Sequence, residues 1–458
     1  MRKFAFLSIF VFCLVKTDYA QVARHFWLND SSYNHTLYPT SDGGYVLAAA
    51  RQQLGASVRN TITVFKLDAG YNIVDSRSIG LPGGLDGFDD IVYFEVHDIT
   101  ENDHGYIICG SIRDPIGSDP PGIGLIGMVT IIDFRLNVHS IRQYQDVITF
   151  YSVYAEGDYF YTCGLAKNGH GIVMRDDIFT MHPQAYITRE PWVYHKIKEN
   201  NGGMDIVVSG NDDNEIGFTA FNTGGFSPIG NASSKFYQPS NSKTVVTNDP
   251  RNSYGFILST SYDFSIYTYL FNDYQTMQHS VYEIHSTYNG GIPQLFLEDM
   301  NTSPTNIAWV GNQWMTDEYD SLNAFYISLD IAFQHQTRYI SYYTQIQPFP
   351  FKERYFLYKI HYNPYDQTFH CGGFYSYINK DKAIFVVAPE LAINNNCGEE
   401  KSLYVRQHQT PYLQHLSIDE VEISVKEQEW YAAQYNFCTV NCESTQLNNY
   451  INNSCGNQ

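Results

Sequence analysis

One short apolar strand that ends on a small residue occurs seven times along this 458-residue sequence. The first two copies are residues 44–49 (GYVLAA) and residues 105–110 (GYIICG). The small residues that end the seven copies are at positions 49, 110, 164, 210, 260, 311 and 372. A period of about 50 residues with β patterning indicates propeller blades rather than a helical solenoid.

A second strand follows each copy, and in six of the seven units it ends on Asp or Asn. These six residues are Asp68, Asp133, Asp176, Asn222, Asn272 and Asp330. Such a side chain can accept hydrogen bonds from the backbone of a tight turn. We therefore interpret the six residues as structural and not as a ring of ligands.

A further strand precedes each first copy and a polar strand follows each second copy, so each unit contains four strands. The sequence thus predicts an all-β protein, a seven-bladed β-propeller of four-stranded blades over residues 33–405. A tandem of β-sandwiches is the alternative, but it gives no reason for seven matched units. Blades cannot bury their faces alone, so the ring must close. We expect residues 21–32 to contain a strand that joins the seventh blade from outside.

The N-terminus has the pattern of a signal peptide over residues 1–20. Arg2 and Lys3 precede an apolar run, residues 4–15, and Ala20 is a small residue at the expected cleavage position. The run is shorter than the roughly 20 residues that a permanent helical anchor needs. We expect an exported chain that begins at Gln21, with a retained anchor as the alternative.

Residues 406–458 do not continue the repeat and are expected to form a short tail rich in Cys and Asn. Within this tail, residues 421–425 alternate like one strand. The tail is predicted to pack on the propeller or to act as a sorting or docking segment. Four cysteines (Cys397, Cys438, Cys442 and Cys455) lie late in the chain, where disulfides are possible. Cys109, Cys163 and Cys371 occupy related places in the repeat, where we expect small buried thiols.

The formal net charge of −20 argues against nucleic acid as a partner, because an acidic chain repels the phosphate backbone. Only 17% of the residues are charged, whereas 38 are Tyr. Neutral polar and aromatic side chains must therefore cover much of the surface.

No catalytic or cofactor motif is convincing, and no cofactor is predicted. Residues 122–127 match G-x-G-x-x-G, but a strand rather than a helix is expected after them, which argues against a dinucleotide site. Two acidic loops, residues 86–90 and 212–215, offer oxygen ligands for Ca²⁺. Neither has the spacing of a known calcium loop, so we interpret them as solvated loops and keep Ca²⁺ as the minor alternative.

Three histidines are the candidate ligand-binding residues. His97, His195 and His361 are expected on the innermost strands of blades two, four and seven, where they could face the axis. The alternative is that each is a core or rim histidine with its hydrogen bonds satisfied. The sequence supports no metal site, because no pair of histidines has helical ligand spacing.

The first repeat resembles those of secreted bacterial β-propellers from Gram-negative envelopes. The resemblance rests on residues 41–49 (SDGGYVLAA) and residues 65–73 (FKLDAGYNI), and it covers about residues 33–146. It implies a propeller and export to the periplasm, the outer-membrane surface or the medium. It assigns no active-site residue, because members of this group have mixed functions.

These observations favour a non-enzymatic binding or scaffold propeller of the cell envelope that interacts with other proteins. Tyr319, Tyr342, Tyr343 and Trp314, in and around blade six, are candidate contact residues. The alternative is a carbohydrate-binding or glycan-hydrolysing propeller, since aromatic and amide side chains also suit sugars. Carboxylates clustered at the axis would favour this alternative.

Overall fold

The computed structural model of the chain describes most of the residues between 23 and 434. The described residues are 23–27, 31–52, 60–80, 93–113, 124–212, 215–235, 243–262, 265–274, 276–286, 294–315, 321–333, 338–342, 353–377, 381–387, 399–401, 403–409, 411–427 and 430–434. The predicted signal peptide and the four late cysteines lie outside these ranges.

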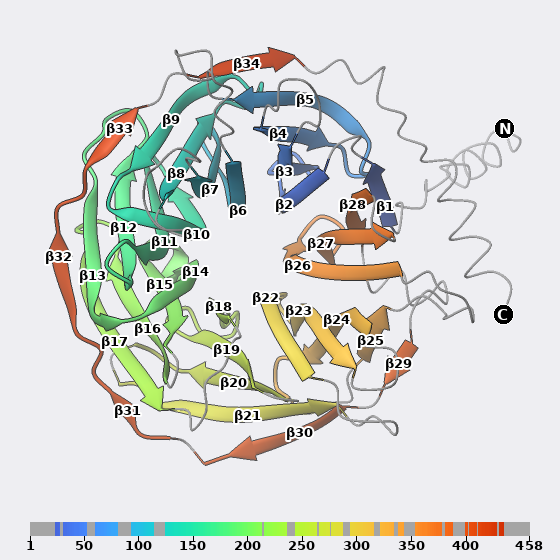
Figure 1. Cartoon of the computed structure of the whole chain (residues 1–458). Coiled ribbons are helices and arrows are strands. Elements are labelled where there is room, and N and C mark those ends of the chain that lie inside the picture. The colour runs from blue at the N-terminus through green and yellow to red at the C-terminus, as the bar shows by residue number, and fades with distance from the viewer. Residues whose placement is uncertain are drawn as a thin grey trace, which may run out of the picture.

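The described strands form seven antiparallel sheets arranged around one axis (Figure 1). The prediction of an all-β propeller is confirmed. The prediction of four strands in every blade is wrong, because six of these sheets have five strands and one has four. The described part of the chain has no helix long and apolar enough to cross a membrane.

Blades 1 to 4 each begin with four consecutive strands, from the axis outward. Blade 1 has β2 (Ser31–Pro39), β3 (Tyr45–Gln52), β4 (Asn60–Leu67) and β5 (Ile73–Gly80). Blade 2 has β6 (Tyr93–Asn102), β7 (Gly105–Arg113), β8 (Leu125–Ile132) and β9 (Val138–Tyr144). Blade 3 has β10 (Val147–Glu156), β11 (Tyr159–Ala166), β12 (His170–Asp177) and β13 (Gln184–Pro191). Blade 4 has β14 (Val193–Asn200), β15 (Asp205–Asn211), β16 (Glu215–Asn222) and β17 (Ser227–Lys235), with the short 3₁₀ helix η1 (Asn201–Gly203) after β14.

Blades 5 and 6 follow the same order, and blade 7 contains only three consecutive strands. Blade 5 has β18 (Thr244–Asn248), β19 (Phe256–Tyr262), β20 (Ser265–Phe271) and β21 (His279–Ser286). Blade 6 has β22 (Gln294–Thr302), β23 (Asn306–Met315), β24 (Ser321–Asp330) and β25 (Arg338–Tyr342). Blade 7 has β26 (Glu353–Asn363), β27 (Thr368–Tyr377) and β28 (Asp381–Val387).

The N-terminal strand β1 (Ala23–Trp27) completes blade 7. It pairs antiparallel with β28, from Ala23 opposite Val387 to Trp27 opposite Ala383. The first described strand of the chain therefore joins the last blade, as the N-terminal sequence led us to expect.

The fifth strands all come from the C-terminal part of the chain, which we call the belt. The belt consists of β29 (Glu399–Lys401), β30 (Leu403–His408), β31 (Leu413–Gln414), β32 (Ile418–Val421), β33 (Val425–Glu427) and β34 (Tyr431–Gln434). In this order they pair with the outermost strands of blades 6, 5, 4, 3, 2 and 1. Figure 1 shows the belt running around the outside of the ring.

The belt corrects two expectations about the tail. The predicted boundary between residues 405 and 406 falls inside β30, which is part of blade 5. Residues 421–425 are not one strand, because Val421 ends β32 on blade 3 and Val425 begins β33 on blade 2. Alternation along the sequence shows which residues face inward, but it does not show that the partner sheet changes between them.

In every blade except blade 5, the innermost described strand has a bulge beside the small-residue position of the repeat. A Cβ atom on Gly110 would lie 1.8 Å from the Glu95 carbonyl oxygen, and one on Gly373 would lie 1.8 Å from the Phe356 carbonyl oxygen. The neighbouring strand has a register shift at each place, between Val96 and Asp98 and between Leu357 and Lys359. In blade 7 the constrained residue is thus Gly373, one position after the Gly372 expected from the sequence.

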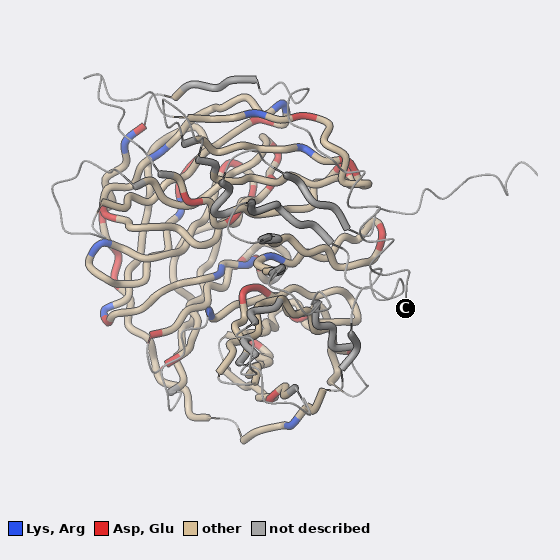
Figure 2. The backbone as a smooth tube through the Cα atoms, turned by 45° about the vertical axis from the view of Figure 1, so that its right-hand side comes forward, with Lys and Arg blue, Asp and Glu red and all other residues tan. Residues whose placement is uncertain are grey.

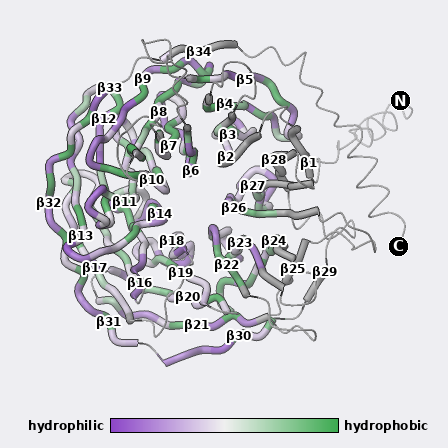
Figure 3. Tube along the Cα trace, in the orientation of Figure 1, coloured by the Kyte–Doolittle hydropathy of each residue, from purple (hydrophilic) through white to green (hydrophobic). Residues whose placement is uncertain are grey.

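The apolar core lies between neighbouring blades. Val46 and Ile62 of blade 1 share one cluster with Ile108 and Met128 of blade 2. Cys109, Cys163 and Cys371 are buried and are not disulfide-bonded, as expected. Much of β30 is hydrophilic (Figure 3), but apolar residues of the belt segment pack against the core clusters, among them Leu403, Val405, Ile418 and Val421.

The recurring acidic residues at strand ends do stabilise turns. Asp68 Oδ1 accepts hydrogen bonds from the backbone of Gly70 and Asn72 at 2.9 and 2.8 Å. Asp133 makes the same pair of contacts in blade 2. In blade 3, Asp176 Oδ1 accepts the backbone N–H groups of Asp177 and His182 at 2.9 and 3.0 Å. Its Oδ2 pairs with buried Arg142 at 2.9 Å, and Asp177 also caps the turn.

Candidate functional site

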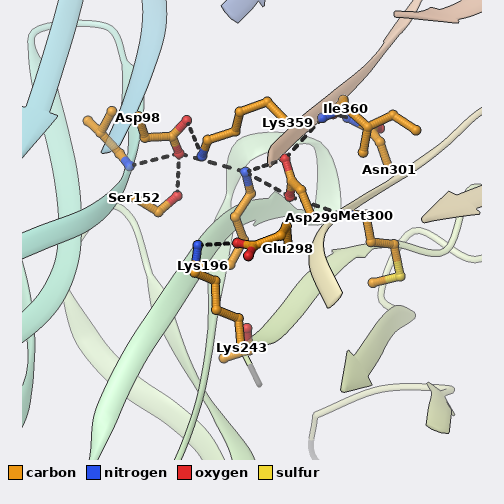
Figure 4. Close-up of polar contacts among 12 residues, drawn as sticks. Asp98, Ser152, Lys196, Lys243, Glu298, Asp299, Met300, Asn301, Lys359 and Ile360 are labelled. Atoms are coloured by element: carbon orange, nitrogen blue, oxygen red, sulfur yellow. Dashed lines mark hydrogen bonds and ion pairs between the residues drawn. The ribbon is translucent and has the colours of Figure 1, made fainter. Parts of the chain in front are cut away.

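Buried charges from four blades meet at the axis of the ring (Figure 4). Lys359 Nζ of β26 lies 3.0 Å from Asp98 Oδ1 of β6. Lys196 Nζ of β14 lies 3.7 Å from Asp98 Oδ2 and 3.2 Å from Asp299 Oδ1 of β22. We call Asp98, Lys196, Asp299 and Lys359 the axial network.

Hydrogen bonds hold the two carboxylates of the axial network in place. Ser152 Oγ donates to Asp98 Oδ2 at 2.5 Å. The backbone N–H of Met300 and that of Ile360 donate to Asp299 at 3.0 and 3.3 Å. A buried charge destabilises the folded protein unless it has such partners. Each residue of the axial network therefore needs its contacts with other inner strands.

The electrostatic environment keeps Asp98 and Lys196 ionised. Burial alone would raise the pKa of Asp98, but Lys196 and Lys359 hold it well below its usual range. Burial alone would lower the pKa of Lys196, but Asp299 and Asp98 raise it above the ordinary value. Asp98 is therefore a fixed anion at neutral pH and cannot act there as a proton donor.

A second ion pair lies beside the network at the axis. Lys243 Nζ, just before β18, is 2.5 Å from Glu298 Oε2 of β22. Glu298 immediately precedes Asp299, at the bulge of the inner strand. Five blades thus contribute charged side chains to these contacts.

The three predicted histidines border this region but do not converge. His97 and His195 each precede a network residue and lie on either side of Tyr151, with ring centroids 5.1 and 5.6 Å away. His361, two residues after Lys359, packs on Tyr38 at 5.3 Å. Burial lowers the pKa of all three, to about 3 for His195 and His361, so they are neutral.

Within the described ranges, no three His, Cys, Asp or Glu residues are placed to hold a metal ion. Most of the acidic loop residues proposed for Ca²⁺ lie outside those ranges. Asp212 is described, and its Oδ1 accepts the Glu215 backbone N–H at 2.6 Å, which is a turn contact. The calcium alternative stays a prediction, because most of its residues lie outside the described ranges.

Sequence reasoning missed the axial network. What its four residues share is a charged side chain directly after the bulge of an inner strand. Without the register of each strand, these residues could not be distinguished from surface charges, and their partners lie on distant blades.

A second feature lies at one end of the ring. In each antiparallel blade, the connection from first to second strand and that from third to fourth strand lie at the same end. Neighbouring connections contact each other, so the blades share this orientation: Asn102 Nδ2 donates to the Gly157 carbonyl at 3.1 Å, and Asn200 Nδ2 to that of Tyr254 at 3.2 Å. We call this end the turn face.

Large exposed apolar side chains gather on the turn face. Among the described residues, those outside the belt segment all lie in or next to its connections: Val74, Phe134, Tyr159, Phe179, Met181, Met204, Tyr254 and Tyr365. Met204 is 65% exposed and Phe179 is 57% exposed. Most connections at the opposite end lie outside the described ranges. Within the described residues, these side chains make the turn face the candidate interaction surface.

Hydrogen bonds between blades fix the shape of the turn face. Arg142 of blade 2 donates to the carbonyls of Asp177, Ile178 and Thr180 in the blade 3 connection. Arg175 of blade 3 donates to the Thr223 carbonyl of blade 4 at 3.0 Å, and its guanidinium lies over Tyr159. The turn face is therefore preorganised, which lowers the entropic cost of binding.

The contact residues expected around blade six are not tested by the structure. Tyr319 and Tyr343 lie outside the described residues, as do the side chains of Trp314 and Tyr342. None of the apolar residues of the turn face was singled out from the sequence, because exposure in a short connection leaves no periodic pattern.

Comparison with solved structures returns propellers. The Dos1 propeller matches with a TM-score of 0.46 at 10% identity, over 80% of this chain and 95% of that one. A mutant of NanB sialidase from Streptococcus pneumoniae matches with 0.43 at 8%, over 80% and 70%. TolB from Acinetobacter baumannii matches with 0.33 at 9%, over 79% and 82%. No protein-family model and no curated protein matches the chain.

Proposed function

We propose that this protein is an exported, non-enzymatic propeller of the cell envelope that binds another protein through its turn face. The observation that carries the proposal is the set of exposed apolar side chains on connections that hydrogen bonds hold in place. Large aromatic side chains on a rigid surface are typical anchors of protein interfaces. The basic and apolar start of the sequence supports export.

The axial network supports a structural role for the centre of the ring. A glycosidase needs one carboxyl group that can be protonated near neutral pH. Asp98 is a fixed anion and Asp299 is bound to Lys196, so neither suits that role. The carbohydrate-active alternative is therefore less favoured than protein binding.

The test is a pull-down of tagged full-length protein from its native cell envelope, with mild crosslinking and mass spectrometry. The test variant is Phe179→Ser with Met181→Ser, and the control variant is Tyr412→Ser, which changes an exposed aromatic residue in the belt segment. We expect a stoichiometric partner with the unchanged protein and the control, and its loss with the test variant. Equal recovery by all three proteins would contradict binding through the turn face.

A further inference from the structure

We infer that the turn face of blades 2 to 4 binds a basic segment of a partner protein that also carries apolar side chains. This inference rests on the proposed function and specifies the chemistry of the partner. The surface concerned comprises residues 101–105, 133–139, 156–159, 177–183 and 199–204, which we call the blade 2–4 patch.

The apolar part of the patch is continuous from blade 2 to blade 3. The Phe179 ring lies 5.0 Å from the His104 ring and 6.1 Å from the His139 ring. Phe134 packs edge-on against Tyr106 at 5.6 Å. Met181 and Tyr159 are exposed in the same connections. An area of this kind suits one or two apolar anchors of a partner.

The patch extends to blade 4 through a close backbone contact. A Cβ atom on Gly203 would lie 2.6 Å from Glu156 Oε1, so the blade 4 connection lies directly against Glu156. Met204, the most exposed apolar residue of this connection, follows Gly203. Apolar contact area and a carboxylate therefore adjoin each other.

Charge in the patch is strongly one-sided. Its carboxylates are Glu101, Asp103, Asp133, Glu156, Asp158, Asp177 and Glu199, and its one permanent cation is Arg135. Arg175 lies next to the patch, but it is hydrogen-bonded to the Thr223 carbonyl and to Gln184. An acidic partner would be repelled here, whereas a segment with Lys or Arg would be attracted.

Several of these carboxylates have internal partners, and two of the exposed ones are open to an added cation. Asp133 and Asp177 accept turn N–H groups, and Asp158 lies 2.9 Å from His104 Nε2. Asp103 and Glu156 are exposed and form no ion pair in the described structure. Glu156 also interacts unfavourably with Glu199, and a cation between the two would relieve this repulsion.

The experiment is a selection of phage-displayed random peptides on the immobilised full-length protein. Bound phage are sequenced and compared with those bound to Phe179→Ser/Met181→Ser and to the control Tyr412→Ser. The most enriched peptides are then synthesised, and their affinity is measured by fluorescence anisotropy. The measurements use the unchanged protein and Asp103→Asn/Glu156→Gln, which keeps the shape of the patch and removes two charges.

We expect peptides enriched in Lys or Arg together with aromatic or aliphatic residues, bound by the unchanged protein and Tyr412→Ser but not by the apolar double variant. Removing two charges should weaken binding roughly tenfold at low salt, and the difference should shrink as salt screens the charges. Patch-dependent peptides without excess basic residues would overturn the basic-partner inference and leave protein binding intact. Selection of the same peptides by all three proteins would overturn the proposed function itself.

Discussion

Lys359 Nζ and Asp98 Oδ1 lie 3.0 Å apart at the axis, although 261 positions separate these residues in the sequence. The contact joins the inner strands of blades 7 and 2, which lie on either side of blade 1. Charged residues occur in many places along the backbone tube (Figure 2), whereas Asp98, Lys196 and Asp299 of the axial network are buried.

Loss of one partner of this contact should be costly. In Asp98→Asn, Lys196 and Lys359 lose a buried counter-ion, and breaking such a pair typically costs about 3–5 kcal/mol. We expect a correspondingly lower free energy of unfolding in urea. The control is Lys66→Gln at the exposed pair with Asp42, which should cost less than about 1 kcal/mol. Equal effects of the two variants would contradict a structural role for the axial network.

Acid should destabilise the protein through its buried histidines. Burial lowers the pKa of His195 and His361 from 6.5 to about 3. Between these values the unfolded chain binds protons that the folded chain does not, so stability falls as the pH decreases through this window. Each histidine contributes at most about 1.4 kcal/mol per pH unit.

The measurement is urea unfolding at pH 7 and pH 5. The variant His361→Gln cannot take up that proton, so its loss of stability between the two pH values should be smaller. His182→Gln, at an exposed position, is the control and should behave like the unchanged protein. A pH dependence that is the same in all three proteins would show that His361 is not the source.

Gly110 should tolerate no side chain. A Cβ atom there would lie 1.8 Å from a backbone oxygen, so Gly110→Ala requires the inner strand to move. We expect Gly110→Ala to lose several kcal/mol or to yield no soluble protein, as overpacking against a fixed backbone implies. Gly157→Ala is the matched control, because Gly157 has φ +56° but nothing within 4 Å of the added atom. It should cost only about 1 kcal/mol, measured by thermal unfolding.

Apolar side chains should help to hold the belt on the ring. Leu416 is the buried apolar residue of the belt segment and packs with the cluster of blades 3 and 4. Leu416→Ala should lower the unfolding free energy by about 2 kcal/mol, at the low end for a buried leucine. Arg189→Gln, which breaks an exposed two-bond contact with Asp419, should change the unfolding free energy little. A smaller loss for Leu416→Ala than for Arg189→Gln would show that ion pairing, not apolar contact, holds the belt.

The repeated features of the fold could be predicted from the sequence, because each blade has the same close strand contacts and tight turns. The small residue at position 110 and the acidic turn residue at position 68 are fixed by contacts within one blade. The belt was not accessible, because its strands are two to six residues long and each pairs with a blade hundreds or tens of positions away. Its pairing with the blades can be recognised only when the arrangement of their outer edges around the ring is known.

For the candidate sites, too, one part could be predicted from the sequence and another could not. His97, His195 and His361 were correctly placed on inner strands, since those strands are recognisable from the repeat. What the histidines contact depends on other blades: His97 and His195 share Tyr151, whereas His361 packs on Tyr38. The turn face depends on exposure, which one sequence does not reveal for connections of a few residues.

The belt can pair with the blades only after the rest of the described chain has been synthesised. Its strands are the last described part of the chain, yet they cover the outer edges of six blades that precede them. While the C-terminal residues are still in the ribosome, those edges present unpaired N–H and C=O groups. Such edges are sites of intermolecular strand pairing. A chain that stops before residue 399 would leave all six edges open, so translation that ends early should yield aggregates rather than a smaller propeller.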